Sequence, residues 1–219
     1  MRRSLRAVAL VVCSLLGARE ARADGLPVSA GASFGWAEPL GSAARGARLR
    51  DTTFGTVPLG LDASYRLLPA LGVVAHGQYG FGVPTLCQTA ADCTASLGTD
   101  IELDLAIRWH LPRFGPTASL VDVGMGYEWF TARLVDAGAH STRSYRGPVL
   151  LSAALAAPFR LSTSWTIGPV IGLWAGTFTA QSLEANTVSS SDNVPGRTVH
   201  AWLRVGVRLE FSLRTKLGQ

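Results

Sequence analysis

The segment at residues 199–213 alternates between two kinds of side chain almost without a break. Every second residue of it is apolar, whereas the positions between include His200, Arg204, Arg208 and Glu210. Successive side chains of a β-strand point to opposite faces, so one face of this segment is wholly apolar and the other is mostly polar or small. The pattern predicts a β-strand with two unlike faces, and it recurs along most of the chain.

The N-terminus has the three parts of a secretory signal. A basic stretch at residues 2–6 precedes an apolar run at residues 7–17, which is too short to span a bilayer. Ala21-Arg22-Ala23 then fits a cleavage site. We therefore expect residues 1–23 to be a secretory signal peptide that is cleaved, as in an exported bacterial protein.

Removal of this signal changes the charge of the protein. Of the 20 Lys and Arg residues five lie in the signal, and of the 15 Asp and Glu residues one does. The mature chain is therefore almost neutral, and its composition gives no reason to expect nucleic-acid binding.

Two cysteines remain after the signal. Cys87 and Cys93 flank a short polar stretch. Two thiols at this spacing, with no histidine nearby in sequence, make a poor zinc site. In an oxidising compartment we expect them to form a disulfide that closes a small loop. No metal or other cofactor is predicted.

The alternation divides the chain into eight strand-like segments. These cover residues 28–37, 56–67, 72–83, 101–111, 119–134, 148–161, 165–179 and 199–213. Tight turns with Pro, Gly or Ser follow the second, fourth and sixth segments. Long polar loops follow the others, at residues 38–55, 84–100, 135–147 and 181–197.

Short turns at one end and long loops at the other are typical of bacterial outer-membrane barrels. A bilayer cannot satisfy the free edge of a sheet, so a spanning sheet must close on itself. We therefore predict an all-β, eight-stranded antiparallel up-and-down transmembrane β-barrel over residues 24–213, followed by a short tail at residues 214–219. The long loops would be extracellular, in the outer membrane of a Gram-negative bacterium.

Aromatic residues of the apolar face gather near the segment ends, as the two girdles of a membrane barrel require. One predicted girdle lies at the short-turn end and the other at the long-loop end. Their members are Tyr65, Trp109, Phe159, Trp165 and Phe211 at the first, and Trp36, Phe81 and Trp129 at the second.

The opposite face carries the charges, which predicts a lumen filled by a polar network. Eight strands leave a lumen that side chains can fill, and buried charges need partners. The predicted members are Asp62, Arg66, Glu102, Asp104, Arg108, Asp122, Glu128, Arg160, Arg204, Arg208 and Glu210. Acids and bases are nearly equal in number, and His76, His110 and His200 share this face.

With this architecture the chain resembles the small eight-stranded outer-membrane barrels of the OmpA transmembrane-domain and OmpX kind. The most specific local match is Arg204, Gly206, Leu209 and Phe211, which is similar to the C-terminal assembly signal of that family. The resemblance implies recognition by the outer-membrane insertion machinery. The family usually ends on the aromatic residue, whereas further residues follow Phe211 here.

Three alternatives compete with a structural or surface-interaction role in the membrane. Lipid A-modifying barrel enzymes use Ser, His and an acid, but the His-x-Ser pattern of the deacylases is absent and His140-Ser141 has the wrong spacing. A soluble barrel would place its charges outside rather than with the lumen glycines. A narrow channel for a small or apolar solute stays open, with Val170, Trp174 and Phe178 facing inward.

We therefore expect a non-enzymatic, monomeric barrel that acts through its extracellular loops. Its predicted partners are outer-membrane lipid, lipopolysaccharide and the insertion machinery. Arginines in the first and third loops could contact lipopolysaccharide phosphates, although ordinary solvated charges explain them equally well. They are Arg45, Arg48, Arg50, Arg143 and Arg146.

Overall fold

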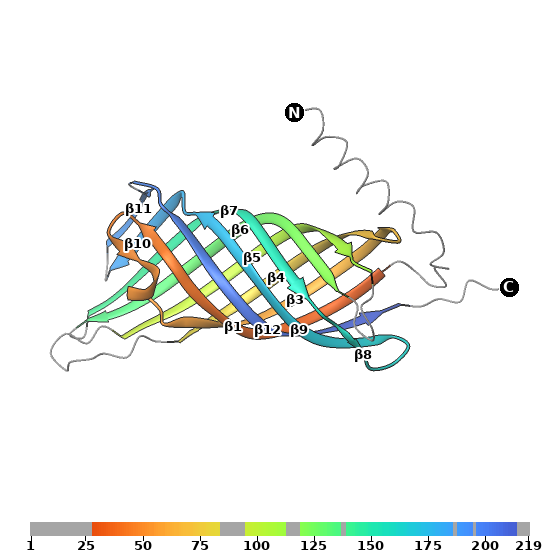
Figure 1. Cartoon of the computed structure of the whole chain (residues 1–219). Coiled ribbons are helices and arrows are strands. Elements are labelled where there is room, and N and C mark those ends of the chain that lie inside the picture. The colour runs from red at the N-terminus through yellow and green to blue at the C-terminus, as the bar shows by residue number, and fades with distance from the viewer. Residues whose placement is uncertain are drawn as a thin grey trace, which may run out of the picture.

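Eight long antiparallel strands wind around a common axis in the computed structural model (Figure 1). The structure describes residues 28–83, 95–112, 119–136, 139–185, 188–194 and 196–213. The long strands are β1 (Val28–Ala44), β3 (Gly55–Leu68), β4 (Leu71–Val83), β5 (Ala95–His110), β6 (Leu120–Asp136), β7 (Ala139–Ala156), β9 (Trp165–Thr177) and β12 (Val199–Ser212). The predicted eight-stranded antiparallel barrel is confirmed.

Five shorter elements complete the described chain. They are β2 (Ala47–Arg48), the 3-10 turn η1 (Leu49–Asp51), β8 (Phe159–Arg160), β10 (Ala180–Ala185) and β11 (Val188–Asn193). In the part of the chain that the structure describes, no helix has the length and apolar character to cross a membrane.

The first and last long strands close the barrel. β1 pairs with β3 on one side and with β12 on the other, in a register that runs from Ser29 opposite Ser212 to Gly41 opposite His200. Gly35 lies opposite Gly206 in this seam, where a Cβ on Gly35 would collide with the carbonyl oxygen of Val205. Glycine at this position therefore allows β1 and β12 to approach.

The outward face of the barrel is apolar, as the alternation predicted. Leu61, Leu105 and Met125 are exposed over 70%, 68% and 68% of their surface, whereas Glu102 and Arg108 are fully buried. Charges inside and leucines outside are the distribution that a lipid-facing barrel requires.

One strand departs from the predicted faces. The alternation within the segment at residues 148–161 predicts that Val149 and Leu151 both lie on the outward apolar face, but Val149 is 2% exposed, while Leu150 and Leu151 are both exposed. The register between β6 and β7 shifts here, between Gly124 and Gly126. An extra residue in one strand reverses the direction of the side chains on one side of it, so this prediction was wrong.

Much of the predicted loop sequence forms strands instead. β6 runs to Asp136 and β7 begins at Ala139, so most of the predicted loop at residues 135–147 is a β-hairpin. β10 and β11 occupy most of the predicted loop at residues 181–197, and β1 extends to Ala44.

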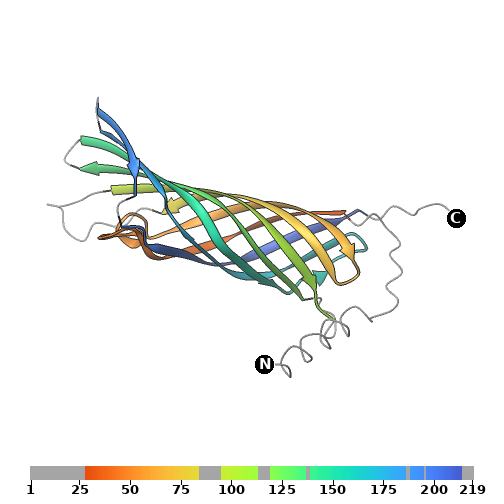
Figure 2. The same ribbon diagram turned by 90° about the horizontal axis from the view of Figure 1, so that it is seen from above.

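These extensions form a sheet beyond the barrel, called here the projecting sheet. It consists of β10, β11 and the adjoining ends of β5, β6 and β7. In Figure 2 its strands flare away at the end of the barrel opposite the start of β1 and the end of β12. This end is called the hairpin end, and the other the short-turn end.

Candidate functional site

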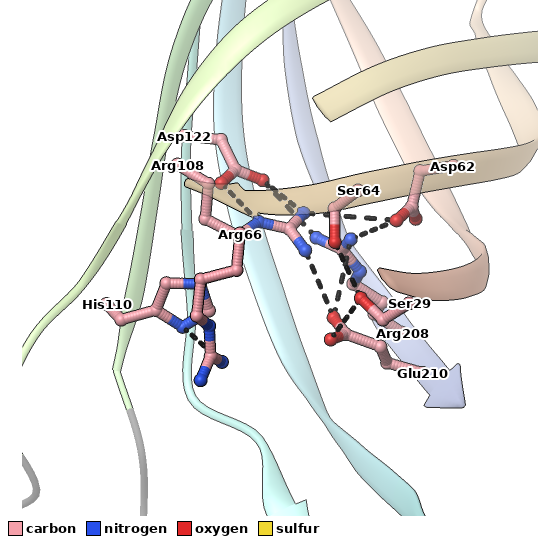
Figure 3. Close-up of polar contacts among 9 residues, drawn as sticks. All are labelled: Ser29, Asp62, Ser64, Arg66, Arg108, His110, Asp122, Arg208 and Glu210. Atoms are coloured by element: carbon pink, nitrogen blue, oxygen red, sulfur yellow. Dashed lines mark hydrogen bonds and ion pairs between the residues drawn. The ribbon is translucent and has the colours of Figure 1, made fainter. Parts of the chain in front are cut away.

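A cluster of ion pairs crosses the lumen near the short-turn end (Figure 3). This cluster is called the inner layer. Arg108 on β5 donates from Nε and Nη2 to the two carboxylate oxygens of Asp122, at 2.8 Å each. The pair is directly opposed across β5 and β6. Two parallel hydrogen bonds of this kind are strong and fix the orientation of both groups.

Strand β12 completes the inner layer from the other side of the lumen. Arg208 forms ion pairs with Asp62 and, at 3.3 Å, with Asp122. The Oε2 atom of Glu210 lies 3.1 Å from Nη1 of Arg108, and the hydroxyl of Ser29 donates to its Oε1 at 2.9 Å. The layer therefore links β1, β3, β5, β6 and β12 across the barrel.

A second polar group, the outer layer, lies closer to the hairpin end. Arg204 forms an ion pair with Glu102 and a longer one with Asp100, at 3.5 Å. The guanidinium of Arg204 also lies 4.0 Å from the ring centre of Trp174, whose indole N–H donates to Asp104 at 3.1 Å. A cation over an aromatic face is attracted to it.

Glu128 is the fourth acid of the outer layer. His200 Nε2 lies 2.7 Å from its Oε2, and the indole N–H of Trp202 donates to its Oε1 at 2.8 Å. All three residues are at most 2% exposed. His200 is therefore part of the packed interior.

Aromatic side chains cover Glu128 and His200 and form an aromatic plug. Phe178 stacks on His200 with ring centres 3.9 Å apart, and Phe130 lies 5.8 Å from Trp202. Tyr145 packs against Phe178 at 5.4 Å. The lumen is thus closed by apolar packing as well as by charges, which the predicted polar network did not include.

A cavity of about 70 Å³ lies between the two layers. Its lining includes Val74, His76, Ala106, Ala154 and Trp174. A space of this size holds a few water molecules, whereas ligand pockets usually exceed about 300 Å³. Of the residues predicted to line a channel, Val170 and Trp174 line this cavity, whereas Phe178 is fully buried in the aromatic plug.

The balance of charge in the lumen differs from the predicted one. Arg160 is exposed on β8, where it donates to the carbonyl of Ser162, and Arg66 is exposed at the rim beside His110. Asp100, expected in a loop, is fully buried. Among the described residues the lumen groups are Asp62, Asp100, Glu102, Asp104, Asp122, Glu128, Glu210, Arg108, Arg204 and Arg208.

The correction has a geometric cause. Arg66 and Arg160 lie at the ends of their segments, where the chain leaves the barrel wall, so alternation alone could not place them. Asp100 follows a polar stretch, so the alternation gave no sign that β5 already begins at Ala95. Carboxylates therefore outnumber guanidinium groups in the described lumen. Each of the three arginines forms ion pairs with more than one carboxylate.

The residues predicted as aromatic girdles lie on the outward face at both rims. Trp165 packs on Phe211 at the short-turn end, with ring centres 4.8 Å apart. Phe81 and Trp129 are exposed at the hairpin end, next to Tyr79 and Tyr127. Tyr65 and Phe159 are exposed, and Trp36 and Trp109 are half-buried.

The remaining predicted residues are placed as follows. Arg204 of the assembly signal points into the lumen, Leu209 is exposed and Gly206 packs on the backbone of Phe34. Recognition of this segment by the insertion machinery stays a prediction. The signal at residues 1–23, the tail at residues 214–219, Cys87 and Cys93 lie outside the described residues, so cleavage and the disulfide also stay predictions.

Comparison with known proteins supports the fold. No protein-family model matches the chain, and no curated protein matches it in sequence. A major outer membrane protein from Thermus thermophilus is similar in structure, with 15% identity, a TM-score of 0.56, and coverage of 84% of this chain and 98% of that one. The outer membrane protein OprG from Pseudomonas aeruginosa has 14% identity, a TM-score of 0.51, and coverage of 86% and 98%.

Proposed function

We propose that the chain spans the outer membrane of a Gram-negative bacterium as a closed, non-enzymatic barrel and binds other molecules through the projecting sheet. The fold that it shares with outer-membrane proteins supports this proposal. The apolar outward face and the two aromatic rims support this location. The inner layer and the aromatic plug support a closed lumen.

The observation that carries the proposal is the edge strand of the projecting sheet. β11 pairs with β10 and, among the strands that the structure describes, is the last on its side of the sheet. Residues 189–193 are all exposed. An edge strand presents unpaired backbone N–H and C=O groups, to which an extended peptide can add as a further strand.

Proline substitution tests this interaction. The N–H groups of neighbouring residues in an antiparallel strand point to opposite sides, so one of Ser190 and Ser191 directs its N–H to the free edge. Peptides would be selected by display against the refolded full chain in nanodiscs. We expect them to protect β11 amides from hydrogen exchange.

Proline at the outward-directed position should abolish peptide binding and leave the β10–β11 hairpin protected, because only the free edge loses a donor. Proline at the neighbouring position should disrupt the hairpin. Ser190→Thr and Ser191→Thr, which keep the backbone N–H, are the matched controls. Peptides that bind without protecting β11, or that bind both proline variants as tightly as the original chain, would contradict the proposal.

A narrow channel is the second candidate, and the cavity between the two layers is the observation that favours it. Planar-bilayer conductance of the purified protein distinguishes the two functions. A closed barrel predicts no stable conductance. A steady conductance that changes its ion selectivity in an Arg208→Gln variant would favour the channel instead.

A further inference from the structure

Among the described residues, the outer layer holds four acids but one arginine. Asp100, Glu102 and Asp104 alternate along β5 and are buried in the lumen. Glu102 lies directly opposite Glu128 of β6, which is buried as well. Like charges that face each other across neighbouring strands are destabilising, and buried charges need partners. Arg204 cannot neutralise four carboxylates, so this layer carries an unbalanced charge while all four are ionised.

Asp100 lies far from its donors and has one oxygen without a partner. Its Oδ2 atom accepts from Gln78 at 3.4 Å and lies 3.5 Å from Arg204, which pairs more closely with Glu102. Its Oδ1 atom has no hydrogen-bond partner in the described part of the chain. The carboxyl groups of Asp100 and Glu128 lie within hydrogen-bond reach of each other. Two ionised carboxylates have no donor between them, whereas a proton on one of them makes this contact a hydrogen bond.

A second polar group beside Asp100 also has no partner. The hydroxyl of Thr56 on β3 is fully buried and forms no hydrogen bond with the other residues that the structure describes. Thr56 and Asp100 meet at Gly80, where a Cβ would lie 3.2 Å from Oγ1 of Thr56 and 3.1 Å from Cβ of Asp100. A protonated carboxyl can donate or accept, so a proton on Asp100 would bring to this place the donor that an ionised carboxylate lacks.

His200 does not supply the missing positive charge. Its Nε2 atom contacts Glu128 at 2.7 Å, whereas its Nδ1 atom is buried and has no partner among the described residues. An imidazolium would hold a second N–H there without an acceptor, which is costly, so the geometry favours the neutral ring that donates from Nε2.

The surroundings of the Asp100–Glu128 pair contain one permanent cation. β3 and β9 contribute the neutral side chains of Thr56 and Trp174 to this layer. The other charged or titratable groups packed around the pair are His76 on β4, Glu102 and Asp104 on β5, Tyr145 on β7, and His200 and Arg204 on β12.

We propose that Asp100 and Glu128 share one proton, and that this proton holds the aromatic plug closed. Glu128 connects the pair with the plug, since it binds His200 and Trp202, which pack on the rings of the plug. Release of the proton to water would leave two adjacent negative charges in a buried space, and their repulsion would displace Glu128 and the rings that it holds. The closed plug binds one proton more than the loosened plug, so a rise in pH favours loosening. The proposal goes beyond the edge of β11 and uses lumen residues alone.

Infrared spectroscopy of the full chain, refolded in lipid nanodiscs, tests for the proton. Asp100→Asn cannot carry it but keeps a donor toward Glu128 and an acceptor for Gln78. The difference spectrum between the original chain and this variant at neutral pH should contain the C=O band of a protonated carboxyl. Asp51→Asn, which removes an exposed acid of η1, is the matched control and should show the loss of a carboxylate only. A difference spectrum of Asp100→Asn without the protonated band would overturn the proposal.

Fluorine NMR of the chain labelled with 5-fluorotryptophan follows the plug. The resonance of Trp202 is assigned by its loss in Trp202→Phe. Because loosening releases one proton, the ratio of loosened to closed plug should rise about tenfold per pH unit on the alkaline side. The ratio should not change with pH in Asp100→Asn. A constant ratio in the original chain, or the same pH dependence in Asp100→Asn, would contradict the proposal.

Two further measurements need only the original chain, so they decide the matter even if Asp100→Asn fails to fold. The protonated-carboxyl band and the closed form of the Trp202 resonance should be lost over the same range of pH, and the absence of such a band at neutral pH would overturn the proposal. Exchange of sodium for N-methylglucamine should alter neither signal. A protonated band that disappears in sodium would assign the pair to a metal cation instead. Each of these outcomes leaves peptide addition to β11 intact.

Discussion

The two ends of the lumen are closed by different chemistry. At the short-turn end, Arg108 and Arg208 bind three carboxylates from β3, β6 and β12. At the hairpin end, Glu128 is held by the neutral donor Trp202 and by His200, under the ring of Phe178. The inner layer thus depends on matching charges, whereas the aromatic plug depends on packing around one acid.

This difference predicts that single substitutions have unequal effects at the two ends. A buried ion pair that loses one partner leaves an uncompensated charge, whereas a carboxylate that loses one neutral donor loses a single hydrogen bond. Measurements of the free energy of unfolding in lipid vesicles can test this comparison.

Arg108→Met should have the largest effect, a loss of about 3–5 kcal/mol, because Arg208 alone would then remain to pair with Asp62, Asp122 and Glu210. Urea unfolding in vesicles measures it. Adding Asp122→Asn should recover part of the loss in a double-mutant cycle. Strict additivity of the two substitutions, or a mild loss from Arg108→Met alone, would show that water screens these charges.

Leu105→Arg should come next, with a loss of about 2–4 kcal/mol, since the outward face meets the bilayer near its middle. The same unfolding experiment applies. Ser190→Arg on the exposed edge strand β11 is the control and should change stability little. If both substitutions were equally tolerated, the outward face would not be lipid-facing.

Trp202→Phe should cost about 1–3 kcal/mol, because it keeps the aromatic packing but removes the hydrogen-bond donor of a buried carboxylate. Trp129→Phe, on the outward face, should cost less. A loss as large as that of Arg108→Met would mean that the hairpin end also depends mainly on charge.

Arg50→Gln should have the smallest effect on stability, about 0–1 kcal/mol, because its ion pair with Glu38 is exposed. The loss should shrink further in high salt, which screens surface charges. A loss that persists in high salt would contradict a purely surface role for this pair.

The sequence was sufficient to predict the strands, the closure and the lumen side of Arg108, Asp122, Arg204 and Arg208. Period-two alternation with charges on one face allows only one arrangement in a bilayer. The projecting sheet could not be predicted, because β10 and β11 carry little contrast between apolar and polar positions. Residues 189–193, a run of Ser, Asp and Asn, resemble a loop in composition.

The contacts between side chains in the lumen could not be predicted from the sequence either. Trp202 lies on the polar face of the last segment, but alternation cannot indicate that it meets Glu128, 74 residues earlier in the chain. The bulge beside Leu150 reverses the faces of β7 without a local marker. Long-range pairing and a single inserted residue both depend on the closed barrel rather than on neighbouring residues.

The seam between β1 and β12 has a consequence for the time course of folding. Ser29 opposes Ser212, so this seam joins residues from the two ends of the barrel sequence. Closing so long a loop carries a large entropic cost, and pairings of high sequence separation form slowly. Until β12 has been threaded into place, β1 presents an open edge, and the rate at which this seam closes sets how long the barrel stays vulnerable to aggregation during its assembly.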